Sequence, residues 1–373
     1  MHILITGCGG FIGSHLLERL LQRADVTVSG WDHQQTKIEH LLAHERLNLR
    51  GADLYACGNE ARLREDVAAA DAVINLAAIC NPSQYNTRPL GVIRSNFTDM
   101  LRLADLCAEH GKWLIHVSTS EVYGRTLASY TGDAAYEDPA LYELREDSTP
   151  FTLGPVQNQR WTYACAKQLM ERYVYAHHYE HGMPFSIIRP LNFFGPRMDF
   201  IPGFEGEGIP RVLACFLSAL LRNEPLQLVD GGHARRVITG IDDAVDAFML
   251  LLDRPEAGQG QVFNIGNPAN ETTIRDLADT MRRLFAEAVG DPAYRDHPMR
   301  TVPGETFYGP GYEDSDRRLP NIDKARDLLG WEPVVPLESV LRETIAYYVE
   351  KYWHVAPGKP RTSTTPSSAT GTA

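Results

Sequence analysis

Short apolar runs alternate with longer stretches of helical periodicity through the first half of the chain. Runs of mostly apolar residues bounded by turn residues predict buried strands, and apolar residues that recur every three or four positions predict amphipathic helices. The predicted strands are residues 2–6, 26–32, 47–54, 72–78, 113–120 and 185–190. The clearest helical stretches between them are residues 11–22 and 95–111. This alternation predicts an α/β fold, a doubly wound parallel sheet with helices on both faces.

The pattern changes after residue 190, where it becomes irregular and richer in glycine and proline. Residues 261–266 predict a late return to the sheet, and residues 273–289 and 336–353 predict two further helices. The predicted organisation is a sheet domain over 1–188 to which 236–268 returns, a smaller C-terminal substrate-binding domain over 189–235 and 269–355, and a disordered tail rich in Pro, Ser and Thr over 356–373.

Composition and charge narrow the classes of partner. The chain has 36 Lys and Arg against 48 Asp and Glu, a net charge of −12, and no long basic run, which argues against nucleic acid as a partner. No apolar run reaches the roughly 18 residues needed to span a membrane, so no membrane association is expected. The six cysteines show no paired spacing, and a strand follows Met1 directly. We therefore expect reduced thiols, no signal peptide and a cytoplasmic protein.

A glycine pattern follows the first predicted strand and opens the first predicted helix. Gly7, Gly10 and Gly13 have a spacing at which the backbone turns tightly and approaches a pyrophosphate at a helix N-terminus, as in Rossmann folds. Asp32 closes the second predicted strand, where a carboxylate accepts from both ribose hydroxyls and repels a 2′-phosphate. The pattern predicts NAD as the cofactor rather than NADP, and a merely tight turn is the alternative. Further predicted cofactor contacts are Phe11, Ile12, Asp53 (near the adenine), Leu54 and Leu76.

A second motif, "WTYACAK", supplies Tyr163 and Lys167. Four residues apart on a helix, the two side chains lie on one face. Lys167 is expected to lower the pKa of the Tyr163 phenol, which makes the phenol a usable base for a sugar hydroxyl, and both residues are expected to contact the cofactor. A surface pair is the alternative for this spacing alone. Hydroxyls and a carboxylate, Ser120 and Glu121 among them, follow the strand ending near residue 117 and can face the ligand.

Taken together, these motifs resemble the extended short-chain dehydrogenases/reductases that act on nucleotide sugars. The segments "STSEVYG", "RPLNFFGPR" and "GYEDSDRRLP" are similar to UDP-glucuronate decarboxylases. Other segments are more similar still to the UDP-apiose/UDP-xylose synthases: "NLAAIC", "YNTRPL", "QRWTYACAKQL", "GPRMDFIPG", "GIPRVLACF", "LVDGG" and "FYGPGYEDSDRRLP". The resemblance extends from residue 1 to about residue 350.

The resemblance implies an NAD-dependent enzyme that oxidises carbon 4 of UDP-glucuronate and releases CO₂ from the resulting β-keto acid. Tyr163 would take the hydroxyl proton, Arg318 would bind the substrate carboxylate bidentately, and Glu121 would act as acid/base at the decarboxylated carbon. Substrate-facing positions by the same resemblance are Tyr85, Arg160 and Asp314, and candidates for nucleotide and phosphate contacts are Asn192, Arg211 and Arg236. A surface salt bridge is the alternative for each of these arginines. The family implies a homodimer, and no metal ion is expected.

Cys80 raises a separate question, because it follows the predicted strand over residues 72–78, whose residues from Ile74 to Ala78 are expected to be buried. In the resembling synthases a ring contraction gives UDP-apiose, and the family has a cysteine at the position that matches Cys80. A second family cysteine matches Ser120, where simple decarboxylases also have serine. Cys80 is therefore either a proton shuttle or a buried structural thiol. The open alternatives for the whole protein are a decarboxylase that gives only UDP-xylose or UDP-4-keto-pentose, and a non-catalytic NAD-binding sensor.

Overall fold

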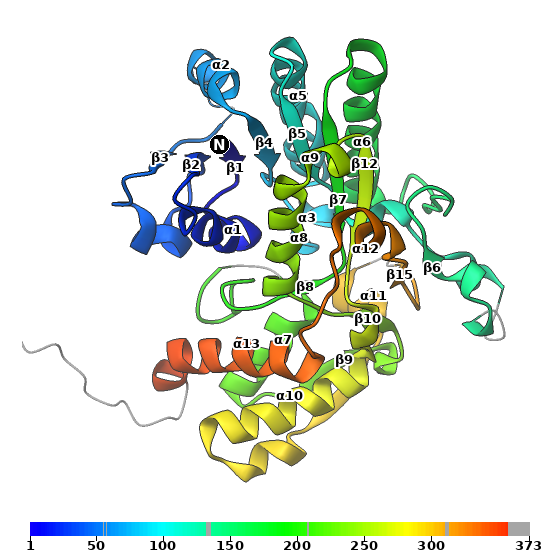
Figure 1. Cartoon of the computed structure of the whole chain (residues 1–373). Helices are drawn as coiled ribbons and strands as arrows, with labels where there is room; N and C mark the ends of the chain where they lie inside the picture. Colours follow the sequence, from blue (N-terminus) through cyan, green and yellow to red (C-terminus); the bar gives the residue numbers. More distant parts are fainter. Residues whose placement is uncertain (55, 57, 132–135, 207–208, 310–312, 357–373) are drawn as a thin grey trace, which may run out of the picture.

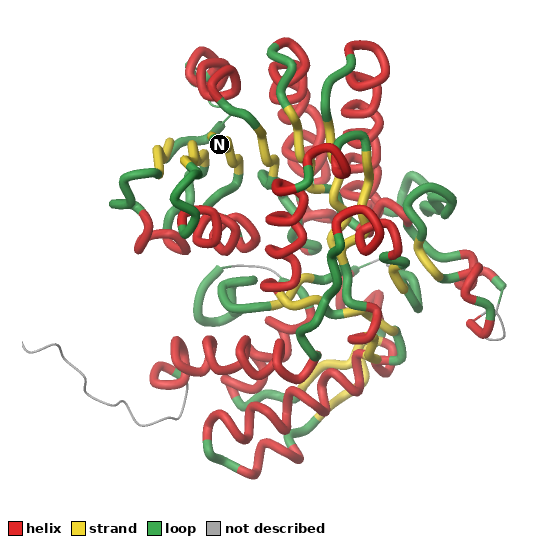
Figure 2. Tube along the Cα trace, viewed as in Figure 1, coloured by secondary structure: helices red, strands yellow, loops and turns green. Residues whose placement is uncertain are grey.

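A seven-stranded parallel sheet forms the centre of the larger part of the protein (Figures 1 and 2). The computed structural model describes residues 1–54, 56, 58–131, 136–206, 209–309 and 313–356. The predicted tail, apart from Ala356, and Cys57 lie outside these residues. In spatial order the strands are β12 (Gln261–Ile265), β7 (Phe185–Pro190), β5 (Trp113–Val117), β4 (Ala72–Asn75), β1 (His2–Thr6), β2 (Thr27–Trp31) and β3 (Leu47–Arg50).

Alternating side chains of these strands are buried on both faces of the sheet, as expected for a doubly wound fold. Ile3 and Ile5 belong to the cluster on one face, whereas Leu4 belongs to the cluster on the other. The first face is covered by α1 (Phe11–Leu21), α8 (Ile241–Asp253) and α12 (Asp323–Leu329), and the second by α2 (Glu60–Ala69), α5 (Asp99–Glu109) and α6 (Thr162–His181). A π-helical turn over Arg94–Thr98 precedes α5. The predicted fold class is confirmed.

A third apolar cluster lies away from the sheet, in the lower part of Figure 1, where α7 (Val212–Arg222), α10 (Ile274–Val289) and α13 (Leu337–Tyr352) pack together. Short strand pairs accompany it: β8 (Phe193–Phe194) with β11 (Thr239–Gly240), β9 (Leu226–Val229) with β14 (Met299–Val302), and β10 (Arg235–Val237) with β13 (Glu271–Thr273). Another pair, β6 (Glu143–Leu144) with β15 (Leu319–Pro320), lies apart from this cluster, and Leu144 is buried with Val122, Tyr123 and Leu191. The remaining helices are α3 (Ser83–Thr87), α4 (Pro89–Ile93), α9 (Pro255–Gly258) and α11 (Gly304–Tyr308).

The packing of α12 differs from the predicted domain boundary. In sequence, residues 322–331 lie between α10 and α13, two helices of the third cluster. Nevertheless Ile322, Leu329 and Trp331 are buried in the cluster on the first face of the sheet. The Trp331 indole nitrogen donates to the carbonyl of Asp243 on α8 at 2.8 Å. The chain therefore crosses back to the sheet once more after β12. Among the described residues, no helix is long and apolar enough to cross a membrane.

The fourth strand ends earlier than the sequence predicts. β4 stops at Asn75, because its neighbour β1 ends at Thr6 and the chain turns away at Gly7, whose backbone lies against Leu76 and Ala77. Burial ends with the strand: Leu76 and Ala77 are only partly buried, and Ala78 is exposed. The prediction that residues 74–78 are buried is therefore wrong at its end. Cys80 lies five residues beyond the strand and is exposed, which excludes a buried structural thiol.

Candidate active site

The glycine turn between β1 and α1 has no room for larger side chains. Gly7 has a φ of +79°, and a Cβ added there would lie 2.7 Å from the backbone nitrogen of Ala77. A Cβ on Gly13 would lie 2.2 Å from the carbonyl oxygen of Gly7. Gly10 precedes α1, and no side chain caps the amides of this helix. The turn therefore presents free N–H groups and a close backbone, which fit the pyrophosphate of a dinucleotide.

Asp32 follows β2 and closes the same turn. Its carboxylate accepts hydrogen bonds from the backbone nitrogens of Gly9 at 2.9 Å and Gln34 at 2.8 Å. These two bonds hold the carboxylate beside the glycine turn, as a ribose-binding residue requires.

The other predicted cofactor residues lie around this turn. Phe11 and Ile12 begin α1 and are partly buried. Asp53 and Leu54 follow β3, with the Asp53 carbonyl accepting from Asn59 at 2.7 Å and Leu54 buried. Leu76 follows β4 directly. All of them therefore follow the carboxyl end of a strand of the parallel sheet, the edge where ligands of open parallel sheets bind.

Tyr163 and Lys167 lie on one face of α6, one turn apart, and both are buried. The Tyr163 ring stacks on Tyr85, with centroids 5.1 Å apart and an interplanar angle of 10°. The Lys167 ammonium donates to the Val117 carbonyl at the end of β5, at 2.9 Å. A surface pair is therefore excluded for these two residues.

Burial is the main influence on the pKa of Tyr163 in this structure, and the expected lowering by Lys167 stays a prediction. Burial raises the pKa of Tyr163 strongly, the charges of Cys80 and Glu121 raise it further, and a hydrogen bond with Thr119 lowers it. The Lys167 ammonium itself is directed to the Val117 carbonyl. Burial lowers the pKa of Lys167 to about 8, against the raising influence of Cys80 and Glu171.

Residues after β5 add a short turn of buried hydroxyls. The Thr119 hydroxyl accepts from the backbone nitrogen of Glu121 at 3.1 Å and so caps the 3₁₀ turn over Ser120–Tyr123. Ser118 and Ser120 are buried beside it. The cap fixes the direction in which the Glu121 side chain leaves the turn.

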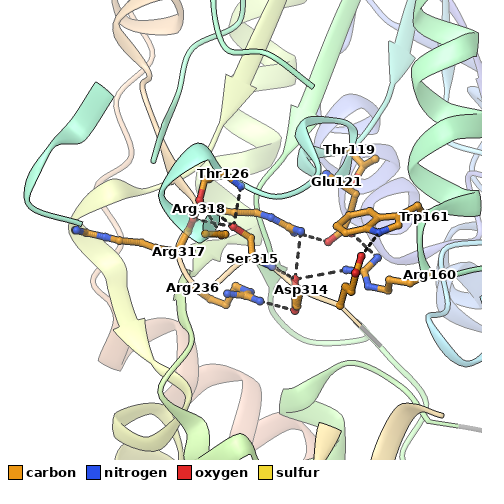
Figure 3. Close-up of polar contacts among 12 residues, drawn as sticks. Thr119, Glu121, Thr126, Arg160, Trp161, Arg236, Asp314, Ser315, Arg317 and Arg318 are labelled. Atoms are coloured by element: carbon orange, nitrogen blue, oxygen red, sulfur yellow. Dashed lines mark hydrogen bonds and ion pairs between the residues drawn. The ribbon is translucent and has the colours of Figure 1, made fainter. Parts of the chain in front are cut away.

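Glu121 is held by two arginines (Figure 3). Its Oε1 lies 2.5 Å from Arg318 Nη1, and its Oε2 lies 2.6 Å from Arg160 Nη1. Asp314 joins the same group, with contacts of 3.2 Å to Arg318 and 2.5 Å to Arg236. We call these five residues the arginine–carboxylate cluster. It brings together residues that are as many as 197 positions apart in the chain.

The charges in the cluster decide the protonation of its acids. Burial alone would raise the pKa of Glu121, but Arg160 and Arg318 outweigh it and lower this pKa to about 2. Burial acts in the same way on Asp314, and Arg236, Arg318 and Arg160 hold its pKa well below the usual range. Both carboxylates are therefore charged at neutral pH in the structure described.

Cys80 lies close to Tyr163 although it has left the strand. Its carbonyl accepts from the Tyr85 hydroxyl at 3.2 Å. The charge of its thiolate form influences the pKa of both Tyr163 and Lys167. An exposed thiol therefore faces the two residues of the motif in α6.

Three predicted nucleotide contacts have other partners. Asn192 donates from its side chain to the Val237 carbonyl at 2.8 Å. Arg211 forms two hydrogen bonds with Asp199, at 3.0 and 2.9 Å, and its guanidinium lies 5.8 Å from the ring centroid of Phe11. Arg236 is part of the arginine–carboxylate cluster. The structure thus brings Arg236 and Arg318 to the same carboxylate, Asp314, and Arg211 to the start of α1. Asn192 is bonded to Val237, the neighbour of Arg236 in β10.

Sequence reasoning did not find several residues that position the site. The Trp161 indole donates to Glu313 at 3.0 Å, and the Arg160 guanidinium lies 5.2 Å from the Trp161 ring centroid. Arg197 pairs with Glu18 on α1 through two contacts of 2.8 Å. Trp161 lies within "QRWTYACAKQL" and Arg197 within "GPRMDFIPG", so the motifs contained these residues, but not their partners.

Over the ranges that the structure describes, no group of three or more His, Cys, Asp or Glu side chains could hold a metal ion.

Comparison with known proteins decides the family. A family model described as "NAD dependent epimerase/dehydratase family" matches residues 3–266, most of the chain. The chain belongs to this family. The NAD-dependent epimerase/dehydratase assignment confirms the predicted resemblance to extended short-chain dehydrogenases/reductases and the predicted cofactor, NAD, which the glycine turn and Asp32 fit.

Relatives within the family are similar over nearly their whole length. The chain is 46% identical over 360 residues to UDP-D-apiose/UDP-D-xylose synthase of Oryza sativa subsp. japonica, covering 94% of this chain and 89% of that protein. It is 47% identical over 357 residues to UDP-D-apiose/UDP-D-xylose synthase 1 of Arabidopsis thaliana, covering 94% and 92%. The structure of the PbgP3 protein from Burkholderia pseudomallei has a TM-score of 0.78 at 32% identity, covering 93% and 96%.

Proposed function

We propose that this protein oxidises UDP-glucuronate at carbon 4 with NAD⁺, decarboxylates it, and converts the product to UDP-apiose, UDP-xylose or both. The observation that carries the proposal is the 2.5 Å contact between Arg318 and Glu121. It joins a carboxylate-binding guanidinium to an acid/base group, and Glu121 also influences Tyr163. The similarity to the plant synthases supports the same substrate.

Each residue of the site has a separate role in the proposed reaction. When bound, NAD⁺ would supply the hydride acceptor for carbon 4, and the NADH formed would return the hydride in the final reduction to UDP-xylose or UDP-apiose. Tyr163 takes the proton of the carbon 4 hydroxyl, with Thr119 bonded to its phenol. Arg318 binds the substrate carboxylate through its guanidinium fork. The ketone at carbon 4 takes up the electron pair left by CO₂, and Glu121 delivers a proton to carbon 5.

Cys80 supports the further step to UDP-apiose. Ring contraction breaks the bond between carbons 2 and 3 and joins carbon 2 to carbon 4, which needs a proton shuttle at the oxygen of carbon 3. The exposed Cys80 thiol beside Tyr163 and Lys167 is available for that role. Ser120 in place of the family's second cysteine favours the alternative product set, UDP-xylose or UDP-4-keto-pentose alone. A homodimer and a cytoplasmic location stay predictions.

The proposal is tested by CO₂ release from UDP-glucuronate, with and without NAD⁺. We expect release only with NAD⁺. Arg318→Lys keeps a charge but loses the bidentate contact, so turnover should fall at least about tenfold, which corresponds to a loss of roughly 1.5 kcal/mol, while NAD⁺ binding persists. Arg172→Lys, at an exposed position of α6, is the matched control and should leave turnover unchanged. No CO₂ release, or full turnover of Arg318→Lys, would contradict the proposal.

A further inference from the structure

The arginine–carboxylate cluster has one more positive charge than negative charges. Among the described residues in contact, three guanidinium groups face two carboxylates. The Arg318 side chain is only 6% exposed, and its Nε has no hydrogen-bond partner among the described residues. A buried charged N–H without an acceptor is unfavourable, which points to a ligand that completes it. The free Nε lies on the same guanidinium that holds both Glu121 and Asp314 (Figure 3).

The two carboxylates of the cluster are not held equally. Asp314 accepts from Arg318 and Arg236 and also from the backbone nitrogen of Ser315 at 2.8 Å. Ser315 is itself fully buried and bonded to Thr126, so Asp314 is fixed to its own segment. Asp314 is therefore the anchored member of the pair.

Glu121 has weaker attachments within the cluster. Its Oε1 bonds Arg318, but its Oε2 and Arg160 Nη1, although 2.6 Å apart, lack the alignment of a hydrogen bond. No backbone N–H donates to the Glu121 carboxylate among the described residues. Glu121 is also the carboxylate of the cluster that influences Tyr163. It is therefore the displaceable member, and it lies on the side where the sugar must bind.

We propose that the carboxylate of UDP-glucuronate displaces Glu121 from Arg318, while Asp314 keeps Arg318 in place, and that the displaced Glu121 takes up the proton it later delivers to carbon 5. The inference rests on the proposed function and adds a ligand exchange to it. When the bond between carbon 5 and the carboxyl carbon breaks, its electron pair moves to the carbon 4 ketone as an enolate. The proton of Glu121 then goes to carbon 5, the enolate becomes a ketone again, and Arg318 returns to the charged Glu121.

The charged groups around Glu121 determine how its pKa changes when the substrate binds. The groups that face it are Arg160, Arg318 and Asp314, with the phenols of Tyr85 and Tyr163. Once Arg318 has turned to the substrate, burial, the charge of Asp314 and the substrate carboxylate all act to raise the pKa of Glu121. Arg160, which lowers this pKa more than Arg318 does, still opposes them. Substrate binding should therefore be accompanied by proton uptake.

Proton uptake is measured by titration calorimetry in two buffers with different ionisation enthalpies. The titrations use the NAD⁺-loaded Tyr163→Phe variant, in which UDP-glucuronate binds without being consumed, at several values between pH 5 and pH 7. We expect uptake of up to one proton per UDP-glucuronate, increasing as the pH falls. UDP-glucose, which lacks the carboxylate, should bind without this uptake. Adding Glu121→Gln should abolish the uptake and keep the binding.

Several results would overturn the exchange. UDP-glucuronate that binds without proton uptake would contradict it while leaving the proposed function intact. Equal uptake with UDP-glucose, or unchanged uptake in the Glu121→Gln variant, would assign the proton to another group and contradict it as well. A protein that binds UDP-glucose but not UDP-glucuronate would contradict the proposed function and the exchange together. Circular dichroism of each variant verifies that it is folded.

Discussion

Tyr163 is the residue on which oxidation depends most directly. It is buried and stacked on Tyr85, so its ring has a fixed position. Burial raises the pKa of the phenol, so the phenol must lose its own proton before it can take one from a sugar hydroxyl. The motif in α6 predicts that Tyr163 and Lys167 share a face, but it cannot predict that Lys167 bonds Val117. That bond depends on β5, 50 positions away in the chain.

We predict that Tyr163→Phe lowers CO₂ release from UDP-glucuronate at least about 100-fold, the lower end for a general base. The substitution keeps the ring and its stacking on Tyr85, so NAD⁺ binding and thermal stability should persist. Tyr175→Phe removes a hydroxyl from an exposed position of the same helix and serves as the control. Turnover of Tyr163→Phe within threefold of wild type would show that another group is the base.

The buried ammonium of Lys167 makes folding stability depend on pH. Burial lowers its pKa from 10.5 to about 8, so between these values the unfolded chain binds more protons than the folded protein. The free energy of unfolding should therefore rise with pH in this window and, below pH 8, carry a constant penalty of roughly 3 kcal/mol. Urea unfolding of wild type and Lys167→Met from pH 7 to pH 10 measures this. The difference between wild type and variant should increase with pH, and a constant difference would contradict the burial effect.

At the scale of elements, the turn between β1 and α1 determines the backbone conformation around the predicted cofactor site. The turn ends β1, so the pairing between β1 and β4 also ends there. Residues 76–80 therefore lie outside the sheet. This effect explains why hydrophobicity alone places the end of β4 too late. The apolar run continues through Ile79, but the neighbouring strand does not.

Close packing in this turn predicts a large effect for a small substitution. In Gly13→Ala the added methyl meets the Gly7 carbonyl, so we expect a loss of about 1–3 kcal/mol in unfolding free energy and weaker NAD⁺ binding. Gly91→Ala, on α4, has no neighbour nearer than 3.8 Å to the added methyl and should leave stability unchanged or slightly higher. Thermal unfolding and NAD⁺ calorimetry compare the two variants. Equal effects of both substitutions would contradict the packing argument.

At the scale of the whole molecule, periodicity and motifs predict the sheet and its flanking helices, and they supply the candidate site residues, whose roles stay predictions. They do not predict which site residues touch. Arg236 and Asp314 are implied as separate ligand contacts, yet they form an ion pair at 2.5 Å, because β10 and the segment before β15 meet there. The return of residues 322–331 to the sheet is likewise decided by the tertiary packing of Trp331. Contacts between distant segments leave no local pattern in the sequence.

The most direct measurement is NMR of the products formed from ¹³C-labelled UDP-glucuronate and NAD⁺, for wild type and Cys80→Ser. The wild type should release CO₂ and form UDP-apiose, with or without UDP-xylose. Cys80→Ser should still consume UDP-glucuronate, because oxidation and decarboxylation rely on Tyr163, Glu121 and Arg318, but it should form little UDP-apiose. A wild type without branched sugar would support the decarboxylase alternative, and an unchanged product ratio in Cys80→Ser would exclude the thiol from the chemistry. A wild type that leaves UDP-glucuronate intact would contradict the proposed function itself.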